Sequence, residues 1–501
     1  MARYSTPKAR TRKSEASSYS EEVTVENKAG GRAYALPKDE ELATLVLTSM
    51  MGDEYYESAD KRIERIRELV KENPYFAAQC ALYARHEAGL RSVSHVLTDA
   101  IVNTIRGEDW TRRFVNKVVF RVDDMTEILA LQLQRGKKGI PNALKRGLAD
   151  AFVRFDAYQL AKYRGERREV SLVDVVNLVH PKPTAKNAEA LQQLVNGTLK
   201  STDTWEAKLT EVGKTAKTVE EKAAMKDEAW GQLVASRKIG YLALLRNLRN
   251  IVNDADDEVL RIALEMLVDP TLIKKSKIFP FQFLSAYAQF DKTDNKSRKV
   301  KTALNKAIEI SLDNLPEFSG KTLIVVDHSG SMGEGIGSNK FIGDLFAAAL
   351  WRKNGNADLM AFGSYAKYAN MDADNALLAL ATQLGHLDVD HSTNLSAAFN
   401  LADKAYDRVF IFSDMQTWAD RSYYYNSSSS QEAFKKYCQK YDVDPWIYSF
   451  DLGGYGSTQF KSTTKGKVVL LAGFSEKIFD IVDKTEVDPA ALVSEIKKVV
   501  I

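Results

Sequence analysis

The chain has 501 residues, 45% of them hydrophobic and 27% charged, with a formal net charge of +3 at pH 7. This composition is typical of a globular protein with two or three domains. No apolar run reaches the roughly 18 residues that a membrane-spanning helix requires, which argues against a membrane-spanning protein.

Charge is distributed unevenly along the sequence. Residues 321–501 contain 18 Lys and Arg against 22 Asp and Glu, whereas the preceding residues contain 52 against 45. A net positive N-terminal part indicates a polyanionic partner. A solvated helical surface explains the same excess, so the charge alone leaves both alternatives open.

The first 35 residues predict a flexible basic arm, because they are polar and interrupted by glycine. Five basic residues within the first 20 positions lack the apolar core of a secretory signal. The two cysteines, Cys80 and Cys438, lie far apart without metal-type spacing, which indicates buried thiols in a reducing compartment. We therefore expect a soluble cytoplasmic protein without a membrane anchor.

Residues 36–315 show a hydrophobic periodicity that is almost entirely helical. Apolar residues recur at i, i+3 and i+4, and clusters of Gly, Pro or Asp separate the segments. The predicted helices include 60–73, 75–88, 93–105, 110–120, 125–134 and 143–163. Many such helices joined by short breaks indicate stacked helical pairs of the HEAT type, although no strict repeat consensus is visible.

Basic side chains are concentrated in short segments of this helical part. Lys and Arg contact phosphate through charge, and Arg adds bidentate hydrogen bonding and base stacking. One cluster lies at 162–168, and the helix predicted from residue 172 stops at a proline with basic residues at its carboxyl end. The candidate RNA-binding residues are Lys162, Arg164, Arg167, His180, Lys182, Arg246, Lys274 and Lys275.

Several of these candidates also have a purely structural explanation. The 162–168 cluster is explained by a solvated turn, because exposure is the commonest fate of Lys and Arg. His180 is explained by capping of its own helix, and Arg246 with Asn250 by bonds that tie helices together.

Beyond Gly320 the pattern changes to strands that alternate with helices. Apolar runs at 322–327, 357–362, 408–413, 446–450 and 467–471 predict a parallel sheet covered by helices within residues 316–501. The polar run at 423–430 predicts a surface loop, which is either a tolerated insertion or a partner contact.

Oxygen-bearing side chains follow two of these strands. The first apolar run leads into Asp327, Ser329 and Ser331, and ligands in open α/β sheets gather at the carboxyl ends of strands. One carboxylate and two hydroxyls suit a hard divalent cation such as Mg²⁺. Downstream, Thr393 opens a helical stretch and Asp414 follows another strand. The structural alternative is that Asp327 caps a helix and Asp414 a turn.

These three loops resemble the metal-ion-dependent adhesion site of von Willebrand factor A domains. The resemblance assigns Asp327, Ser329 and Ser331 to the first loop of that site, Thr393 to the second and Asp414 to the third. The chain departs from the pattern at His328, where a small or β-branched residue is usual. It departs again at His391-Ser392, where two glycines commonly precede the threonine.

The whole pattern resembles the Ro autoantigen family, in which a TROVE helical-repeat ring precedes a von Willebrand factor A domain. The segments that carry the resemblance are Leu178-Val179-His180-Pro181-Lys182-Pro183, Leu244-Leu245-Arg246-Asn247-Leu248-Arg249-Asn250 and Phe279-Pro280-Phe281-Gln282-Phe283. The resemblance covers residues 30–501. It implies an α-helical HEAT-like repeat ring followed by an α/β Rossmann-like domain, in a bacterial or phage-type homologue.

The resemblance also implies a function, namely an RNA-binding scaffold in noncoding RNA quality control. Proteins of this family bind small structured Y-type RNAs on a basic outer surface and the single-stranded 3′ ends of misfolded RNAs through the hole of the ring. By position, Lys162, Arg164, Arg167 and His180 match the RNA-contacting stretch. A monomeric ring and an exoribonuclease partner follow from the same analogy.

Two other functions stay open. One is a protein-binding adaptor whose metal ion takes an acidic residue from a partner. The other is Mg²⁺-dependent phosphodiester cleavage. One metal ion with two carboxylates and no clustered base is a weak basis for two-metal chemistry of that kind. No Ser-His-Asp order, paired-carboxylate pocket or Walker loop is visible in the sequence, so we expect no enzymatic activity.

Overall fold

The computed structural model describes residues 24–26, 32–48, 59–135, 139–165, 168–200, 218–237, 239–290, 294–416, 430–453, 457–460, 467–472, 482 and 491–501. Arg167, the loop at 423–429 and most of the N-terminal arm lie outside these residues. The chain divides into two compact units. The helical unit comprises Pro37–Ala216 with Ala491–Ile501, and the mixed unit comprises Met1–Leu36 with Lys217–Ala490.

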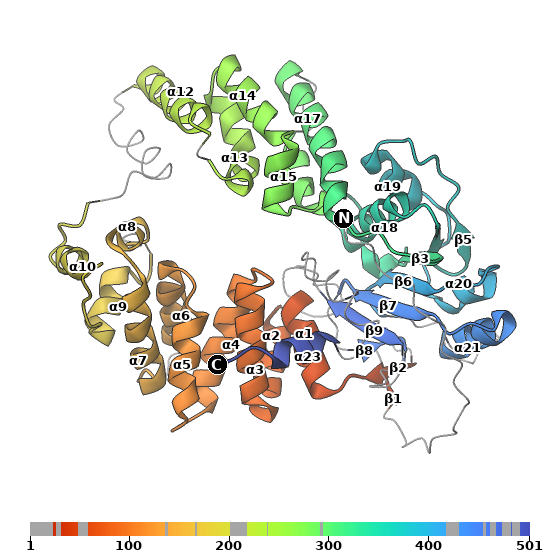
Figure 1. Cartoon of the computed structure of the whole chain (residues 1–501), viewed down its shortest axis with the longest axis horizontal. Helices are drawn as coiled ribbons and strands as arrows, with labels where there is room; N and C mark the ends of the chain where they lie inside the picture. The colour runs from red at the N-terminus through yellow and green to blue at the C-terminus, as the bar shows by residue number, and fades with distance from the viewer. Residues whose placement is uncertain are drawn as a thin grey trace. The chain divides into compact units, whose positions relative to one another are not determined.

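The helical unit consists of short helices stacked in two rows (Figure 1). Helices α1, α3, α5 and α7 contact one another in succession, and α2, α4, α6 and α9 form the second row. The described elements are α1 (Lys38–Thr48), α2 (Ala59–Glu72), α3 (Pro74–His86), α4 (Arg91–Thr104), α5 (Asp109–Val118), α6 (Val122–Gln134), α7 (Asn142–Ala151), η1 (Phe152–Arg154), α8 (Ala157–Lys162), α9 (Leu172–Val179), α10 (Ala188–Val195) and α23 (Ala491–Lys497). This arrangement confirms the predicted stacking of helical pairs.

Capping residues set the helix boundaries. Helix α3 begins at Pro74 after Asn73, whose side chain accepts the Phe76 N–H, and a proline at the first helical position removes no hydrogen bond. The prediction of one helix over 143–163 is wrong. Asp156 accepts the N–H of Gln159 at 2.8 Å and starts α8 anew, since a side-chain cap competes with continuation of the preceding helix.

The last residues of the chain pack in the helical unit, whereas the sequence pattern groups them with the sheet. Helix α23 contacts α1 and α3. The Gln79 side-chain amide donates to the carbonyl oxygens of Lys497 at 2.7 Å and Val499 at 2.9 Å. The ammonium group of Lys117 donates to the Val500 carbonyl at 3.0 Å.

The mixed unit begins with a second set of stacked helices. These are α12 (Val219–Ala235), α13 (Tyr241–Asp254), α14 (Asp257–Leu267), α15 (Pro270–Ser276), η2 (Pro280–Phe283), α16 (Leu284–Tyr287), α17 (Asn295–Ser311) and η3 (Leu312–Asn314). They join the sheet-bearing part through aromatic and ionic contacts. The Phe281 ring stacks on Phe346 with centroids 5.1 Å apart, and Arg352 pairs with Glu309 at 2.7 Å.

The sheet of this unit has six strands in the order β5-β4-β3-β6-β7-β9. The strands are β3 (Thr322–Asp327), β4 (Ala357–Phe362), β5 (Ala366–Tyr368), β6 (Arg408–Ser413), β7 (Trp446–Asp451) and β9 (Val468–Ala472). The helices that alternate with them are α18 (Asn339–Lys353), α19 (Leu377–Gly385), α20 (Ser396–Leu401) and α21 (Ser430–Tyr441). Five strands are parallel, and the edge strand β5 is antiparallel to β4. The predicted parallel sheet is therefore a mixed one.

Strand order places the end of β3 at a topological switch point. The chain passes from β3 to β4 on one side and returns to β6 on the other side. In sheets of this type ligands bind in a crevice outside the carboxyl ends of the strands at such a point, here β3 and β6. Asp327 ends β3, and Asp414 follows β6 directly.

A small second sheet joins the beginning of the chain to a later segment. Strands β1 (Thr24–Glu26), β2 (Arg32–Ala35) and β8 (Ser457–Thr458) are antiparallel in the order β1-β2-β8. Part of the predicted arm is thus paired. None of the described helices is long and apolar enough to cross a bilayer. Closure of the helical repeats into a ring stays a prediction.

Candidate functional site

The Asp327 carboxylate lies at the end of the central strand and is fully buried. Its Oδ1 accepts the Ser329 N–H at 2.9 Å, and its Oδ2 accepts the Ser413 hydroxyl at 2.6 Å. The hydroxyl oxygens of Ser329 and Ser331 lie 3.2 Å apart. The first loop therefore gathers one carboxylate and two hydroxyls, while each Asp327 oxygen keeps a lone pair for a further ligand.

Asp414 brings a second buried carboxylate to this crevice. Its Oδ1 accepts the Gln416 N–H at 3.1 Å, whereas its buried Oδ2 has no hydrogen-bond partner among the described residues. Burial raises the pKa of Asp414, and the neighbouring Asp327 charge raises it further. Burial likewise raises the pKa of Asp327. Two buried carboxylates that disfavour each other's charge, one with an orphaned oxygen, are stabilised together by a divalent cation.

The donor set fits a hard cation more closely than a soft one. No group of three or more His, Cys, Asp or Glu side chains that could hold a metal ion occurs within the described part of the chain. The oxygens of Asp327, Asp414, Ser329 and Ser331 would instead leave open positions for water or a ligand. Such incomplete all-oxygen coordination is typical of Mg²⁺ in proteins.

The loop that carries Thr393 is fastened to the first loop through its backbone. The Gly330 N–H donates to the His391 carbonyl at 3.0 Å, and the Asn394 N–H donates to the Gly363 carbonyl at 2.9 Å. Thr393 is buried between these two attachments. Gly363 permits this close approach, because a Cβ there would overlap the carbonyl oxygens of Val389 and Asp390.

We expect Gly363→Ala to lower both the melting temperature and the Mg²⁺ affinity. The added methyl group must displace the backbone that leads to Thr393, and overpacking of this kind costs about 1–3 kcal/mol. Calorimetric unfolding with and without Mg²⁺ measures both effects. Gly355→Ala is the matched control, because a Cβ at residue 355 meets no atom within 4 Å. If both variants have the same melting temperature and the same Mg²⁺ affinity, the close backbone approach at Gly363 does not affect the site.

His328, the first departure from the adhesion-site pattern, has a partner that the sequence did not reveal. Its Nε2 lies 2.7 Å from Oδ1 of Asp344 on α18, and both side chains are buried. Burial raises the pKa of Asp344, while the hydrogen bond from His328 opposes that rise. The histidine therefore ties the first loop to α18. The two residues lie 16 positions apart on different elements, so no local sequence pattern predicts the pair.

The candidate RNA-binding residues fall into the two units. Lys162, Arg164, His180 and Lys182 belong to the helical unit, and Arg246, Lys274 and Lys275 belong to the mixed unit. Most of these side chains are exposed. Arg164 is half-buried, and its guanidinium donates to the Leu199 carbonyl, which indicates a structural role. Asn250 bonds Asn247 on its own helix at 3.2 Å.

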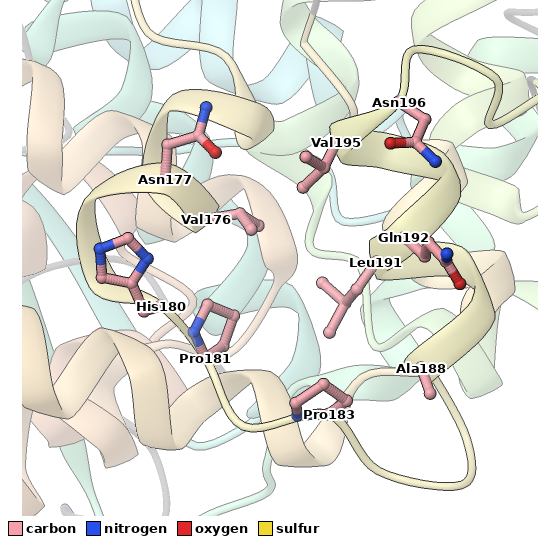
Figure 2. Close-up of a pocket in the computed structure, with 10 residues that line it drawn as sticks. All are labelled: Val176, Asn177, His180, Pro181, Pro183, Ala188, Leu191, Gln192, Val195 and Asn196. Atoms are coloured by element: carbon pink, nitrogen blue, oxygen red, sulfur yellow. The ribbon is translucent and has the colours of Figure 1, made fainter.

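His180 lies at the rim of an open groove of about 590 Å³ between α9 and α10. It ends α9 in the left-handed conformation with φ of 48°. Its backbone therefore also fits the alternative in which His180 caps its own helix. Figure 2 shows Leu191 and Val195 projecting from α10 toward the side of the groove that carries Pro181. Amide side chains of the same groove supply donors and acceptors, which gives it an apolar floor with polar edges. They are Asn177, Gln192 and Asn196.

A buried ionic network near this surface was missed by the sequence analysis. Asp124, at the start of α6, is fully buried and accepts from the guanidinium of Arg85 at 2.9 Å and that of Arg91 at 2.9 Å. It also accepts the backbone N–H groups of Phe120 at 2.9 Å and Arg121 at 2.8 Å. One carboxylate therefore fixes the turn between α5 and α6.

The comparisons with known proteins agree with this architecture. The sequence profile of the TROVE domain matches residues 7–228 and 198–333. RNA-binding protein RO60 of Deinococcus radiodurans is 25% identical over 375 residues, which cover 66% of this chain and 70% of that protein. Telomerase protein component 1 of Mus musculus is 21% identical over 315 residues, which cover 46% of this chain and 12% of that protein.

A solved structure extends the likeness beyond the profile. The crystal structure of the Ro (RSR) protein of Deinococcus radiodurans matches with a TM-score of 0.61 at 19% sequence identity, and the match covers 92% of this chain and 100% of that chain. At this identity the match establishes a shared fold, helical repeats and α/β sheet together.

Proposed function

The chain belongs to the TROVE domain family, and from this premise we propose that it is an RNA-binding protein without catalytic chemistry of its own. The observation that carries the proposal is the exposed basic rim of the helical unit. Lys162, His180 and Lys182 are exposed there, and none of them forms an ion pair with a described carboxylate. Exposed Lys side chains and a groove with amide edges in the same unit suit phosphates and bases together.

The finer part of the proposal concerns the kind of RNA. We propose that the ligands are a small structured, Y-like noncoding RNA and the single-stranded 3′ ends of misfolded RNAs, bound in the cytoplasm. The name of the Deinococcus relative supports RNA as the ligand class. An exoribonuclease that acts on the captured RNA belongs to the same proposal.

The loops that carry Asp327, Thr393 and Asp414 favour a second candidate function, a metal-dependent protein adaptor. The orphaned Oδ2 of Asp414 and the buried Asp327 suit a cation that keeps an open position. An acidic side chain of a partner protein would complete its coordination. These loops belong to the mixed unit and the basic rim belongs to the helical unit, so each can be tested without disturbing the other.

We expect Lys162→Ala with Lys182→Ala to weaken binding of a structured RNA with a single-stranded tail by about 10- to 100-fold near 0.1 M salt. Each lost phosphate contact also lowers the slope of log affinity against log salt by about 0.7–0.9. Filter binding across a salt series measures both quantities. Arg164 is left intact because of its bond to the Leu199 carbonyl.

The matched control is Lys435→Ala with Lys436→Ala, which removes the same charge from exposed positions on α21 of the mixed unit. If both double variants bind RNA like the wild type with an unchanged salt slope, the basic rim of the helical unit does not carry the interaction.

A further inference from the structure

Phe120 is exposed to an unusual degree for a phenylalanine, with 57% of its surface accessible. It lies in the turn between α5 and α6 of the helical unit. Single exposed apolar residues are common and need no explanation by themselves. This ring differs because its surroundings hold it in one orientation.

Two cationic or polar side chains support the ring. The Arg85 guanidinium carbon lies 5.0 Å from the ring centroid, over one face, and Arg85 itself is only 6% exposed. The His86 ring meets Phe120 edge-on at 5.3 Å, and His86 is held by the Lys117 carbonyl at 2.8 Å. Although these two side chains cover part of the ring, most of the Phe120 surface stays accessible.

The backbone of this turn is fixed by a buried carboxylate, that of Asp124. Asp124 Oδ2 accepts the N–H groups of Phe120 and Arg121, and the same carboxylate bonds the Arg85 that backs the ring. The ring and its support are therefore positioned by one buried group. A side chain held in this way loses little conformational entropy when a ligand stacks on it.

A second aromatic residue, Tyr163, is linked to this turn through Arg121, which follows Phe120 in the chain. The Arg121 guanidinium lies 4.9 Å from the centroid of Tyr163 and is bonded to Asp123 at 2.8 Å. The Lys162 ammonium lies 5.5 Å from the same ring. The aromatic platform, defined as Phe120, Arg121, Tyr163 and Lys162, thus combines π faces with positive charge.

We propose that the aromatic platform binds an unpaired segment of RNA, with a base stacked on the exposed part of the Phe120 ring and a phosphate of the same strand held by Lys162. The inference rests on the proposed RNA-binding function and names the part of the RNA that this surface takes. Aromatic faces interleaved with Lys and Arg are the usual means of holding single-stranded nucleic acid. The exposed Lys162 favours a polyanion over an apolar protein segment, which would leave its charge unpaired.

The test uses the full chain and an oligoribonucleotide of about ten unpaired residues that contains 2-aminopurine. We expect Phe120→Ala to weaken binding by roughly 5- to 100-fold and to abolish the fluorescence change that stacking causes. The salt slope should stay unchanged, because no charge is lost. Phe120→Trp should restore both affinity and the fluorescence change.

The matched control is Tyr75→Ala. Tyr75 is 47% exposed and is also held edge-on by a neighbouring ring, Trp110, at 5.4 Å. It lies at the start of α3, whereas His86 ends the same helix. Phe120→Leu, which keeps apolar bulk without a π face, separates stacking from any effect on folding, and thermal unfolding of each variant checks the fold.

The outcomes separate this inference from the function on which it rests. Absence of RNA binding by the wild type overturns the proposed function itself. Binding by the wild type with equal affinity for the Phe120→Ala, Phe120→Leu and Tyr75→Ala variants overturns the aromatic platform alone. A strand whose bases are replaced by abasic sites should bind the wild type and Phe120→Ala equally, and a persistent difference would contradict base stacking.

Discussion

Asp124→Ala is expected to lower the free energy of unfolding of the helical unit by about 3–5 kcal/mol, the usual cost of leaving a buried charge unpaired. The buried Arg85 loses its carboxylate partner, and the N–H groups of Phe120 and Arg121 lose their acceptor. Equilibrium unfolding in urea measures the loss. Asp150→Ala is the control, because Asp150 pairs with Arg112 on the exposed surface and exposed pairs contribute at most about 1 kcal/mol.

The same network predicts how stability depends on pH. Burial alone would raise the pKa of Asp124, but hydrogen bonds from His95 and the Arg121 backbone outweigh it and hold that pKa well below its ordinary value of 3.8. Burial would lower the pKa of His95, but hydrogen bonds to Asp124 and Glu127 raise it above 6.5. Both shifts therefore favour the charged forms in the folded state.

The signs of the two shifts define a pH window. The contribution of Asp124 is complete above pH 3.8 and is lost as the pH falls toward its lowered pKa. The contribution of His95 is complete below pH 6.5 and is lost as the pH rises through its raised pKa. The difference in stability between wild type and Asp124→Ala should therefore be largest between these two values. A difference in stability that stays constant from acid to alkaline pH contradicts the assignment of these pKa shifts to Asp124 and His95.

Asp327→Asn is expected to remove the stabilisation of the protein by Mg²⁺. A ligand present at 100 times its dissociation constant stabilises the folded state by about 2.7 kcal/mol, and the substitution takes one of two carboxylates from the site while keeping side-chain volume. The melting temperature in Mg²⁺ and in chelator gives the difference. Asn supplies only one acceptor oxygen for the Ser329 N–H and the Ser413 hydroxyl, so the comparison is the gain that Mg²⁺ gives each protein and not the melting temperature in chelator.

The matched control for this second prediction is Asp388→Asn, which removes the same charge from a side chain that is 79% exposed. RNA binding by the basic rim should survive both substitutions, since Lys162, His180 and Lys182 lie on the helical unit. If the wild type gains no stability from Mg²⁺, or if Asp327→Asn retains the gain, these loops do not hold the cation and the adaptor function loses its support.

The sequence by itself determined where most elements lie. Buried parallel strands consist of short continuous apolar runs, so β3, β4 and β6 were predicted at their observed bounds. Helical periodicity located α2 to α6 to within a few residues, because the repeat of 3.6 residues records which face is buried. Strand order then placed the carboxyl groups of the first and third loops at the ends of neighbouring strands, as the general rule for such sheets predicts.

Only the tertiary structure decided which distant residues meet. The pairs His328 with Asp344 and Asp124 with Arg85 depend on helix packing, and no periodicity encodes a side-chain partner on another element. The short edge strand β5 was missed because three residues give no alternating pattern. The C-terminal residues pack on α1 and α3 through bonds from Gln79 to backbone carbonyls more than 400 positions away. Such contacts arise when the chain folds back on itself, so local sequence patterns carry no record of them.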